Sequence, residues 1–196
     1  IDANKTYLES VNELYHTKEE ANVTYKLIRK EAFLANGNLN AAFLRMTEEP
    51  KSKRQNMHNT YAIVLLNHTF LSAVAALSAY IQTHTTTSAS EHFELIIRYI
   101  IGKLDNAIEI LQDMALSPIP SREAVTAAQE VLNDKYDLLN QLRDKEWEQT
   151  HSPMSEGLRA KFQEGKLIIN QLNWLVELAE QSAEMSKVVY DKKRGV

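Results

Sequence analysis

A long stretch without Asp, Glu, Lys or Arg dominates the first half of the chain. No Asp, Glu, Lys or Arg occurs between Arg54 and Glu91, although charged residues make up 24% of the sequence. Within it, residues 61–81 are a run of 21 uncharged residues, enough for a helix to cross the hydrocarbon core of a bilayer. A helix that is apolar nearly all round is either a membrane span or the centre of a soluble bundle.

The content of this stretch favours a buried helix over a membrane span. It includes Asn67, His68, Thr69, Ser72 and Ser78 together with five alanines. Basic residues precede the stretch, but no cluster of basic residues flanks its C-terminal end, where such a cluster can mark the cytoplasmic side of a membrane span. The other helical segments are amphipathic and need an apolar surface to cover their own apolar faces. We therefore predict a helix over 56–83 in the middle of a bundle.

The rest of the chain has the pattern of an all-α protein. It has only five Gly and four Pro among 196 residues, which predicts few turns and long helices. Apolar residues recur in steps of four and three, the heptad pattern of packed helices. We predict a single domain over 1–196, an elongated antiparallel bundle of about five helices whose long first and last members carry heptad seams and pair with each other. The predicted helices cover 3–46, 56–83, 89–116, 122–150 and 153 to about 190.

Local signals set these boundaries. The apolar spacing of the first helix is interrupted at Lys18, and Gly37 between two Asn residues predicts a kink or break, because Gly weakens a helix. Pro50 ends that helix. The expected helix starts are Ser88 with Glu91 as a capping box, Ser121 as an N-cap, and Ser152 followed by Pro153.

Composition excludes several functional classes. Without Cys the chain has no disulfide and no thiolate metal or redox site. Its net charge of −4 gives no reason to expect nucleic acid as a partner. Nucleophile elbows and phosphate-binding Gly loops are absent from the sequence. We therefore do not expect an enzyme, and we assign no catalytic, cofactor-binding or metal residues.

Two Glu-x-x-His spacings are candidate pairs of metal ligands. Glu13 with His16, and Glu148 with His151, each place two ligands on one helix face, as in carboxylate-bridged di-iron bundles. Such a site needs two more inward carboxylates, and the predicted apolar seams of the other helices lack them. We interpret both pairs as surface groups.

His68 is the one histidine in the middle of the uncharged helix. A lone His there is usually a hydrogen-bonded core residue, the reading that we favour. With Asn67 it can alternatively form a pH-sensitive contact.

Two quoted stretches resemble a known bacterial family. YKLIRKEAFLANGNLNAAFLRMTEEPKSK (25–53) and LLNHTFLSAVAALSAYI (65–81) are similar to the C-terminal cytosolic region of fusaric acid resistance-like inner-membrane proteins, the aromatic acid exporter family. Asn36-Gly37-Asn38 departs from the uninterrupted Ala-rich helix expected there. The residues that carry the resemblance are Tyr25, Arg29, Ala32, Asn36, Leu39, Ala42, Met46, Glu49, Pro50, His68, Leu71, Ser72 and Tyr80.

The resemblance implies a function beside a membrane. Members of the family have a membrane-spanning block followed by a cytosolic helical block, and some are implicated in efflux of small acids. It implies that this chain is the soluble block at the cytoplasmic face of the inner membrane, non-enzymatic, with a role in oligomerisation or regulation. Its expected partners are the membrane-spanning block of the same polypeptide and further copies of itself. The alternative is a free-standing helical interaction or sensor domain.

Two further observations fit a block beneath a membrane. The chain begins with Ile1 and lacks the zones of a signal peptide, so we interpret it as an excised piece or a processed product. Basic residues that could rest near anionic lipid gather in three clusters. These are Lys26, Arg29 and Lys30; Lys51, Lys53 and Arg54; and Lys192 to Arg194.

Overall fold

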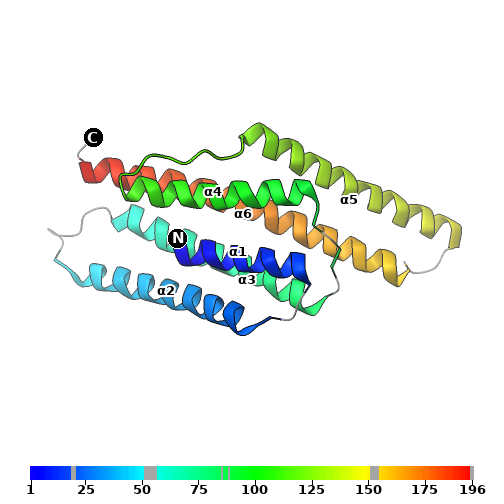
Figure 1. Cartoon of the computed structure of the whole chain (residues 1–196), viewed down its shortest axis with the longest axis horizontal. Coiled ribbons are helices and arrows are strands. Elements are labelled where there is room, and N and C mark those ends of the chain that lie inside the picture. The colour runs from blue at the N-terminus through cyan, green and yellow to red at the C-terminus, as the bar shows by residue number, and fades with distance from the viewer. Residues whose placement is uncertain (19–20, 51–56, 85, 88, 151–154, 195–196) are drawn as a thin grey trace.

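The described part of the chain is entirely helical in its regular structure. The computed structural model describes residues 1–18, 21–50, 57–84, 86–87, 89–150 and 155–194, and these contain no strand. The predicted all-α bundle is confirmed, with six helices in these residues where about five were predicted (Figure 1). They are α1 (Asp2–Thr17), α2 (Val23–Glu48), α3 (Met57–Thr83), α4 (Glu91–Leu111), α5 (Arg122–Thr150) and α6 (Glu156–Arg194).

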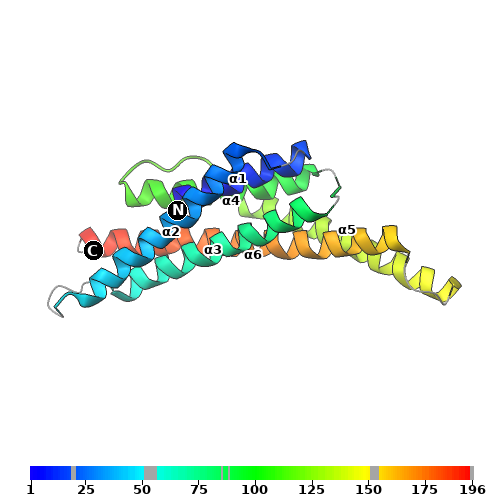
Figure 2. The ribbon, with the colours of Figure 1, turned by 90° about the horizontal axis from the view of Figure 1, so that it is seen from below.

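The longest helix, α6, is the axis of the bundle. Its 39 residues extend for about 58 Å at 1.5 Å per residue, and α4, α3 and α5 all pack along it (Figures 1 and 2). Helix α1 lies on α3 and α4, and α2 packs on α1 and α3. The predicted pairing of the first and last helices is wrong, because neither α1 nor α2 is a packed neighbour of α6.

Helices α4 and α6 run parallel, contrary to the antiparallel prediction. Hydrogen bonds between the α4 region and α6 advance together in both segments, from Thr87 with Glu164 to Tyr99 with Glu180. The parallel course arises because residues 112–121 return along the outside of the bundle before α5 begins (Figure 1).

The predicted first helix is two helices. Lys18 adopts a left-handed conformation with φ 56°, and its backbone N–H donates to the Leu14 carbonyl, which ends α1. The Asn22 side chain then accepts a hydrogen bond from the Tyr25 backbone N–H at 2.8 Å and begins α2. The chain folds back here, so that α2 packs on α1. No break occurs at Asn36–Asn38, because α2 continues through Gly37 to Glu48.

The predicted helix over 89–116 is shorter at both ends. Ser90, not Ser88, caps it by accepting a hydrogen bond from the Phe93 backbone N–H, and Ser88 lies outside the described residues. At the other end, α4 stops at Leu111, and Asp113 has φ 59°. The Glu109 carboxylate then binds both the backbone N–H and the hydroxyl of Ser117, which folds the following segment back toward the helix.

The other boundaries follow the sequence more closely. Ser121 accepts a hydrogen bond from the Ala124 backbone N–H at 3.2 Å and caps α5 as predicted. Helix α3 matches the predicted 56–83 to within one residue. Ser152 and Pro153 lie outside the described residues, and α6 begins at Glu156.

The core is a continuous layer between α6 and the helices around it. Burying a large apolar side chain contributes about 1.5–3 kcal/mol, so the core side chains dominate the stability of the bundle. The largest fully buried ones include Tyr7, Phe70, Ile97, Tyr99, Leu172 and Leu175.

Two helical glycines have opposite surroundings and predict opposite effects on stability. A Cβ at Gly37 would meet nothing within 4 Å, whereas a Cβ at Gly102 would lie 2.5 Å from Ile119 Cγ2. We expect Gly37→Ala to raise the free energy of unfolding by about 0.5–1 kcal/mol through helix propensity. Gly102→Ala should lower it by about 1–3 kcal/mol, because Ile119 must be displaced. Urea titrations of the two variants measure both; a stabilised Gly102→Ala would show that residues 112–121 do not pack on α4 as described.

Candidate functional site at the exposed helix face and the buried carboxylate

Helix α3 is covered on one face only. Its buried side chains include Val64, Phe70, Leu71 and Val74, which face α6, α1 and α2. The prediction that α3 occupies the middle of the bundle is therefore wrong, since it lies at the edge. Its opposite face is an uncharged stripe in heptad-like steps. The exposed positions are Tyr61, Leu65, His68, Ser72, Ala76 and Ala79.

This geometry corrects the interpretation of His68. The histidine side chain lies on the exposed stripe and is not a core residue. The buried polar residue is its neighbour Asn67, whose Nδ2 donates to the Ile63 carbonyl at 2.9 Å. Asn4 of α1 donates to the Asn67 carbonyl at 2.8 Å, so Asn67 joins α3 to α1.

Helix α3 also passes a length and composition test for a membrane span. Among the described residues, Met57–Thr83 is the one helix long and apolar enough, and 44% of its most apolar window is buried within the bundle. Core helices of soluble proteins satisfy the same criterion. Length and composition therefore do not tell whether a lipid bilayer or another protein surface contacts the exposed half of α3.

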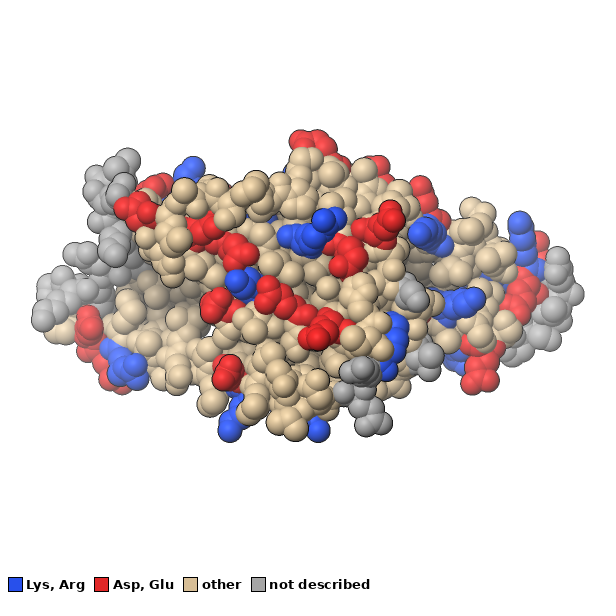
Figure 3. Space-filling model, in the orientation of Figure 1, with Lys and Arg blue, Asp and Glu red and all other residues tan. Residues whose placement is uncertain are grey.

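A second exposed stripe runs along α2. Only Tyr25 and Ala32 of this helix are buried. The opposite side carries large apolar side chains that are about half or more exposed. On the face of the molecule that Figure 3 shows, Lys and Arg are interspersed with Asp and Glu and do not gather in one patch. In steps of four and three, the stripe consists of Val23, Leu27, Lys30, Leu34, Gly37, Ala41 and Leu44.

The two stripes belong to neighbouring helices. Helices α2 and α3 lie side by side in both ribbon views (Figures 1 and 2). The rings of Phe43 and Tyr61 are in contact, with centroids 5.6 Å apart. We name the two stripes together, with Phe33 beside the α2 stripe, the α2–α3 face.

One of the predicted basic clusters lies at one edge of this face. Lys26, Arg29 and Lys30 line a shallow open hollow with Phe33 and Leu34, and the Arg29 guanidinium lies 5.7 Å from the Phe33 ring centroid. The cluster over 51–54 lies outside the described residues, as do the side chains of residues 192–194.

A buried polar network fixes the hairpin of α2 and α3 on α1. The hydroxyls of Tyr7 and Tyr25 are 3.2 Å apart, Tyr25 also binds the Ser78 hydroxyl, and Gln82 Nε2 donates to the Tyr25 hydroxyl at 2.9 Å. Burial and the neighbouring Tyr25 raise the pKa of Tyr7. Because these polar groups satisfy one another, they hold α2 in one position although it buries few apolar side chains.

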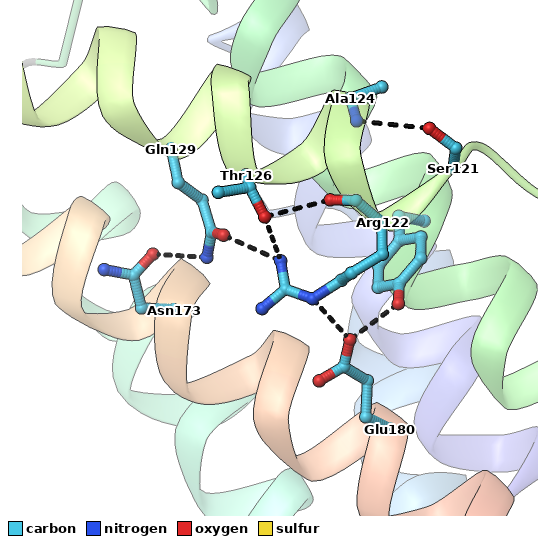
Figure 4. Close-up of polar contacts among 8 residues, drawn as sticks. Ser121, Arg122, Ala124, Thr126, Gln129, Asn173 and Glu180 are labelled. Carbon is cyan, nitrogen blue, oxygen red and sulfur yellow. Dashed lines mark hydrogen bonds and ion pairs between the residues drawn. The ribbon is translucent and has the colours of Figure 1, made fainter.

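A second polar network attaches the start of α5 to α6 and α4 (Figure 4). Glu180 Oε1 accepts a hydrogen bond from the Tyr99 hydroxyl at 2.6 Å and lies 2.8 Å from Arg122 Nε. Burial raises the pKa of Tyr99, and the hydrogen bond to the Glu180 carboxylate raises it further. Gln129 continues the network, accepting from Arg122 Nη1 at 3.0 Å and donating to Asn173 at 2.8 Å. The donors and acceptors are paired with one another, so the network positions helices.

A further carboxylate, Glu164, is buried. Its side chain on α6 is only 5% exposed. Oε1 accepts from the Thr87 backbone N–H at 2.7 Å, the Thr87 hydroxyl at 2.9 Å and the Tyr15 hydroxyl at 3.4 Å. Glu164 also lines a cavity of about 240 Å³ between α4, α5 and α6. Buried ionisable groups in cavities are candidates for binding sites.

Glu164 corrects a further prediction, that the inner seams lack carboxylates. The apolar residues Leu172, Val176 and Ala179, continued toward the start of α6 in steps of three and four, lead to Ile169 and Gly165. The buried positions there are instead Ile168 and Glu164. Helix α6 packs against three helices, so neighbouring positions along it are both partly buried. The spacing of apolar residues alone therefore does not show which of them points into the core.

The Glu-x-x-His pairs do not assemble into a metal centre in the described part of the chain. His16 Nε2 lies 2.5 Å from Glu94 Oε1, where it joins the ends of α1 and α4. His151 lies outside the described residues. In the residues described, no group of three or more His, Asp and Glu side chains could hold a metal ion.

Comparison with known proteins supplies a membrane connection. The chain is homologous to an inner-membrane protein. It is 28% identical over 122 residues to inner membrane protein YccS of Escherichia coli K12, a match that covers 62% of this chain and 15% of YccS. YccS is of the fusaric acid resistance-like type, which agrees with the resemblance drawn from the sequence. The matched region is thus a small part of that relative, and no family model and no solved structure matches the chain.

The buried Tyr15 predicts a pH-dependent stability. Burial, together with the negative charge of Glu164, raises the pKa of Tyr15 to about 12. The folded state then holds this proton above pH 10, where an unfolded tyrosine releases it, so stability falls as pH rises from about 10 to 12. A difference of about two pKa units corresponds to about 3 kcal/mol. Wild type should therefore lose about 3 kcal/mol of unfolding free energy between about pH 10 and 12 through Tyr15. We expect Tyr15→Phe to lack this loss when urea titrations are repeated across the same pH range. Tyr61→Phe, at an exposed position, is the control and should leave the profile unchanged; equal profiles for wild type and Tyr15→Phe would contradict the assignment.

Proposed function

We propose that the chain is a non-enzymatic helical block at the cytoplasmic face of a bacterial inner-membrane efflux protein, and that it joins copies of that protein through the α2–α3 face. The homology to an inner-membrane protein supports the membrane setting. The exposed apolar face is the single observation that carries the assembly role. The membrane-spanning block of the same polypeptide is the second partner.

The composition of the face supports contact with protein. The exposed stripe of α3 has no Asp, Glu, Lys or Arg along its length, so a second copy meets no like charge there while His68 is neutral. Ser72, Ala76 and Ala79 are small and allow another helix to approach closely. A two-fold axis would place the same patch on both copies, the commonest arrangement in homo-oligomers.

The size of the face also fits a dimer. Seven large apolar side chains leave roughly 100 Å² each exposed, which is on the order of 700 Å² per copy and close to the roughly 800 Å² per partner of a standard interface. Their exposed fractions range from 47% to 72%. The seven are Val23, Leu27, Phe33, Leu34 and Leu44 on α2, and Tyr61 and Leu65 on α3.

Attachment to a membrane strengthens such a contact. Copies confined to one bilayer meet at a high effective concentration, so a weak contact between the isolated blocks becomes a stable one in the complete protein. The basic hollow formed by Lys26, Arg29 and Lys30 overlaps one edge of the face, because Lys30 belongs to both. We propose that this rim contacts anionic lipid, while the apolar stripe contacts the second copy.

A pair of matched charge substitutions tests the assembly role. Leu34 on the α2–α3 face and Leu138 on α5 are both 54% exposed and both lie within helices. We expect Leu34→Glu to weaken self-association of the purified chain at least about tenfold, because it places two carboxylates in one apolar contact. Leu138→Glu should have little effect. Sedimentation velocity over a concentration series measures both.

The same experiment can reject the proposal. A wild-type chain that stays monomeric at millimolar concentration and also when anchored to vesicles would contradict it. Equal loss of association in the two variants would place the contact elsewhere. A wild-type chain that requires detergent to remain monodisperse would instead indicate that a bilayer covers α3.

A further inference from the structure

The cavity beside Glu164 is separate from the α2–α3 face and is not used by the proposed assembly. Its volume is about 240 Å³, larger than the roughly 150 Å³ cavity that holds benzene in an engineered protein. Its walls are mainly apolar, with aromatic rings contributed by Tyr15, Phe93 and Tyr136. A body of one aromatic ring with a short side chain therefore fits.

Among the described residues that line the cavity, Glu164 is the one acidic side chain. The three hydrogen bonds that the described residues give it all end on Oε1. A carboxylate has about four acceptor positions on two oxygens, so Oε2 retains the capacity to bind a donor. Because Thr87 and Tyr15 hold the carboxylate in place, a ligand that binds it need not order the side chain.

Two lysines, Lys135 and Lys161, also line the cavity, but both side chains are exposed. In water a charge acts roughly fourfold more weakly than at the effective dielectric of a protein site, and long side chains keep their ammonium groups in solvent. Lys18 is near Glu164, yet its Nζ is bound to the Thr86 hydroxyl and the Thr87 carbonyl. The buried carboxylate therefore sets the sign of charge preferred inside the cavity.

We propose that this cavity binds a small amphipathic amine, with its protonated nitrogen on Glu164 and its aromatic or branched aliphatic body among the aromatic walls. Aromatic faces favour cations as well as apolar groups. The walls come from α1, α4, α5, α6 and the segment before α4. A bound amine thus joins α5 to the rest of the bundle and makes this end of the molecule a ligand-responsive part of the chain.

Three probes of one shape and different charge test the proposal. Phenethylamine, 2-phenylethanol and 3-phenylpropanoate share the same phenylethyl body and carry a cation, a neutral hydroxyl and an anion. Isothermal titration calorimetry of the chain should show one site for phenethylamine. The alcohol should bind at least about tenfold more weakly, and the acid should show no binding.

Variants locate the site. Glu164→Gln should weaken phenethylamine binding at least about tenfold. Glu177→Gln is the control, because Glu177 is an exposed α6 carboxylate that does not line the cavity, and it should bind as wild type. Leu34→Glu should also bind as wild type, so failure of the assembly proposal does not affect this one.

Gly165→Ala provides a test that does not depend on the stability of Glu164→Gln. A Cβ there would meet Tyr136 Cδ2 at 3.4 Å and Leu139 Cδ1 at 3.8 Å, ordinary contacts at the cavity wall. The added methyl narrows the cavity and favours the helix, so affinity for phenethylamine should fall while the Tm rises. The proposal is overturned if phenethylamine does not bind, if 3-phenylpropanoate binds as tightly, or if a folded Glu164→Gln or Gly165→Ala binds as wild type.

Discussion

The packing of α6 against three other helices is the interaction on which the rest of the structure depends. Five of the eight residues from Leu172 to Ala179 are fully or almost fully buried, since α3, α4 and α5 approach this helix from different sides. One consequence is that α6 can hold Glu164 in the interior, where Thr87 and Tyr15 donate hydrogen bonds to its Oε1. Another is that α1 and α2 are left to pack on α3 and α4, away from the axis.

This arrangement determines which faces of the uncharged helix α3 are buried. Helix α6 covers one face of α3, with α1 and α2 beside it, and the opposite face is left outside. An apolar face of this length on an edge helix is unusual for a monomer. Two proposals rest on this arrangement: that the α2–α3 face contacts another copy, and that the Glu164 cavity binds a small cationic ligand.

The sequence predicted what depends on local chemistry. The long stretch without Asp, Glu, Lys or Arg predicted the bounds of α3 to within one residue, and Ser121 predicted the start of α5. Features that depend on tertiary packing were missed. The reversal at Lys18 is stabilised by contacts between α1 and α2, which the sequence does not reveal. A local signal for it is Asn22, a residue type that commonly caps the start of a helix. Glu164 was missed because a helix buried on several sides has no single apolar register, and the parallel course of α4 and α6 depends on how residues 112–121 return.

The central claim is that the α2–α3 face joins copies of the chain in its membrane setting. The chain contains no cysteine, so a single cysteine can be placed at Leu34 or, as the matched position, at Leu138 in the membrane-embedded protein, with any other cysteine removed. Treatment with a short bifunctional maleimide then reports proximity between copies. The account predicts a cross-linked dimer for the cysteine at position 34 and little for that at position 138. Equal cross-linking at the two positions, or none at position 34, would contradict it.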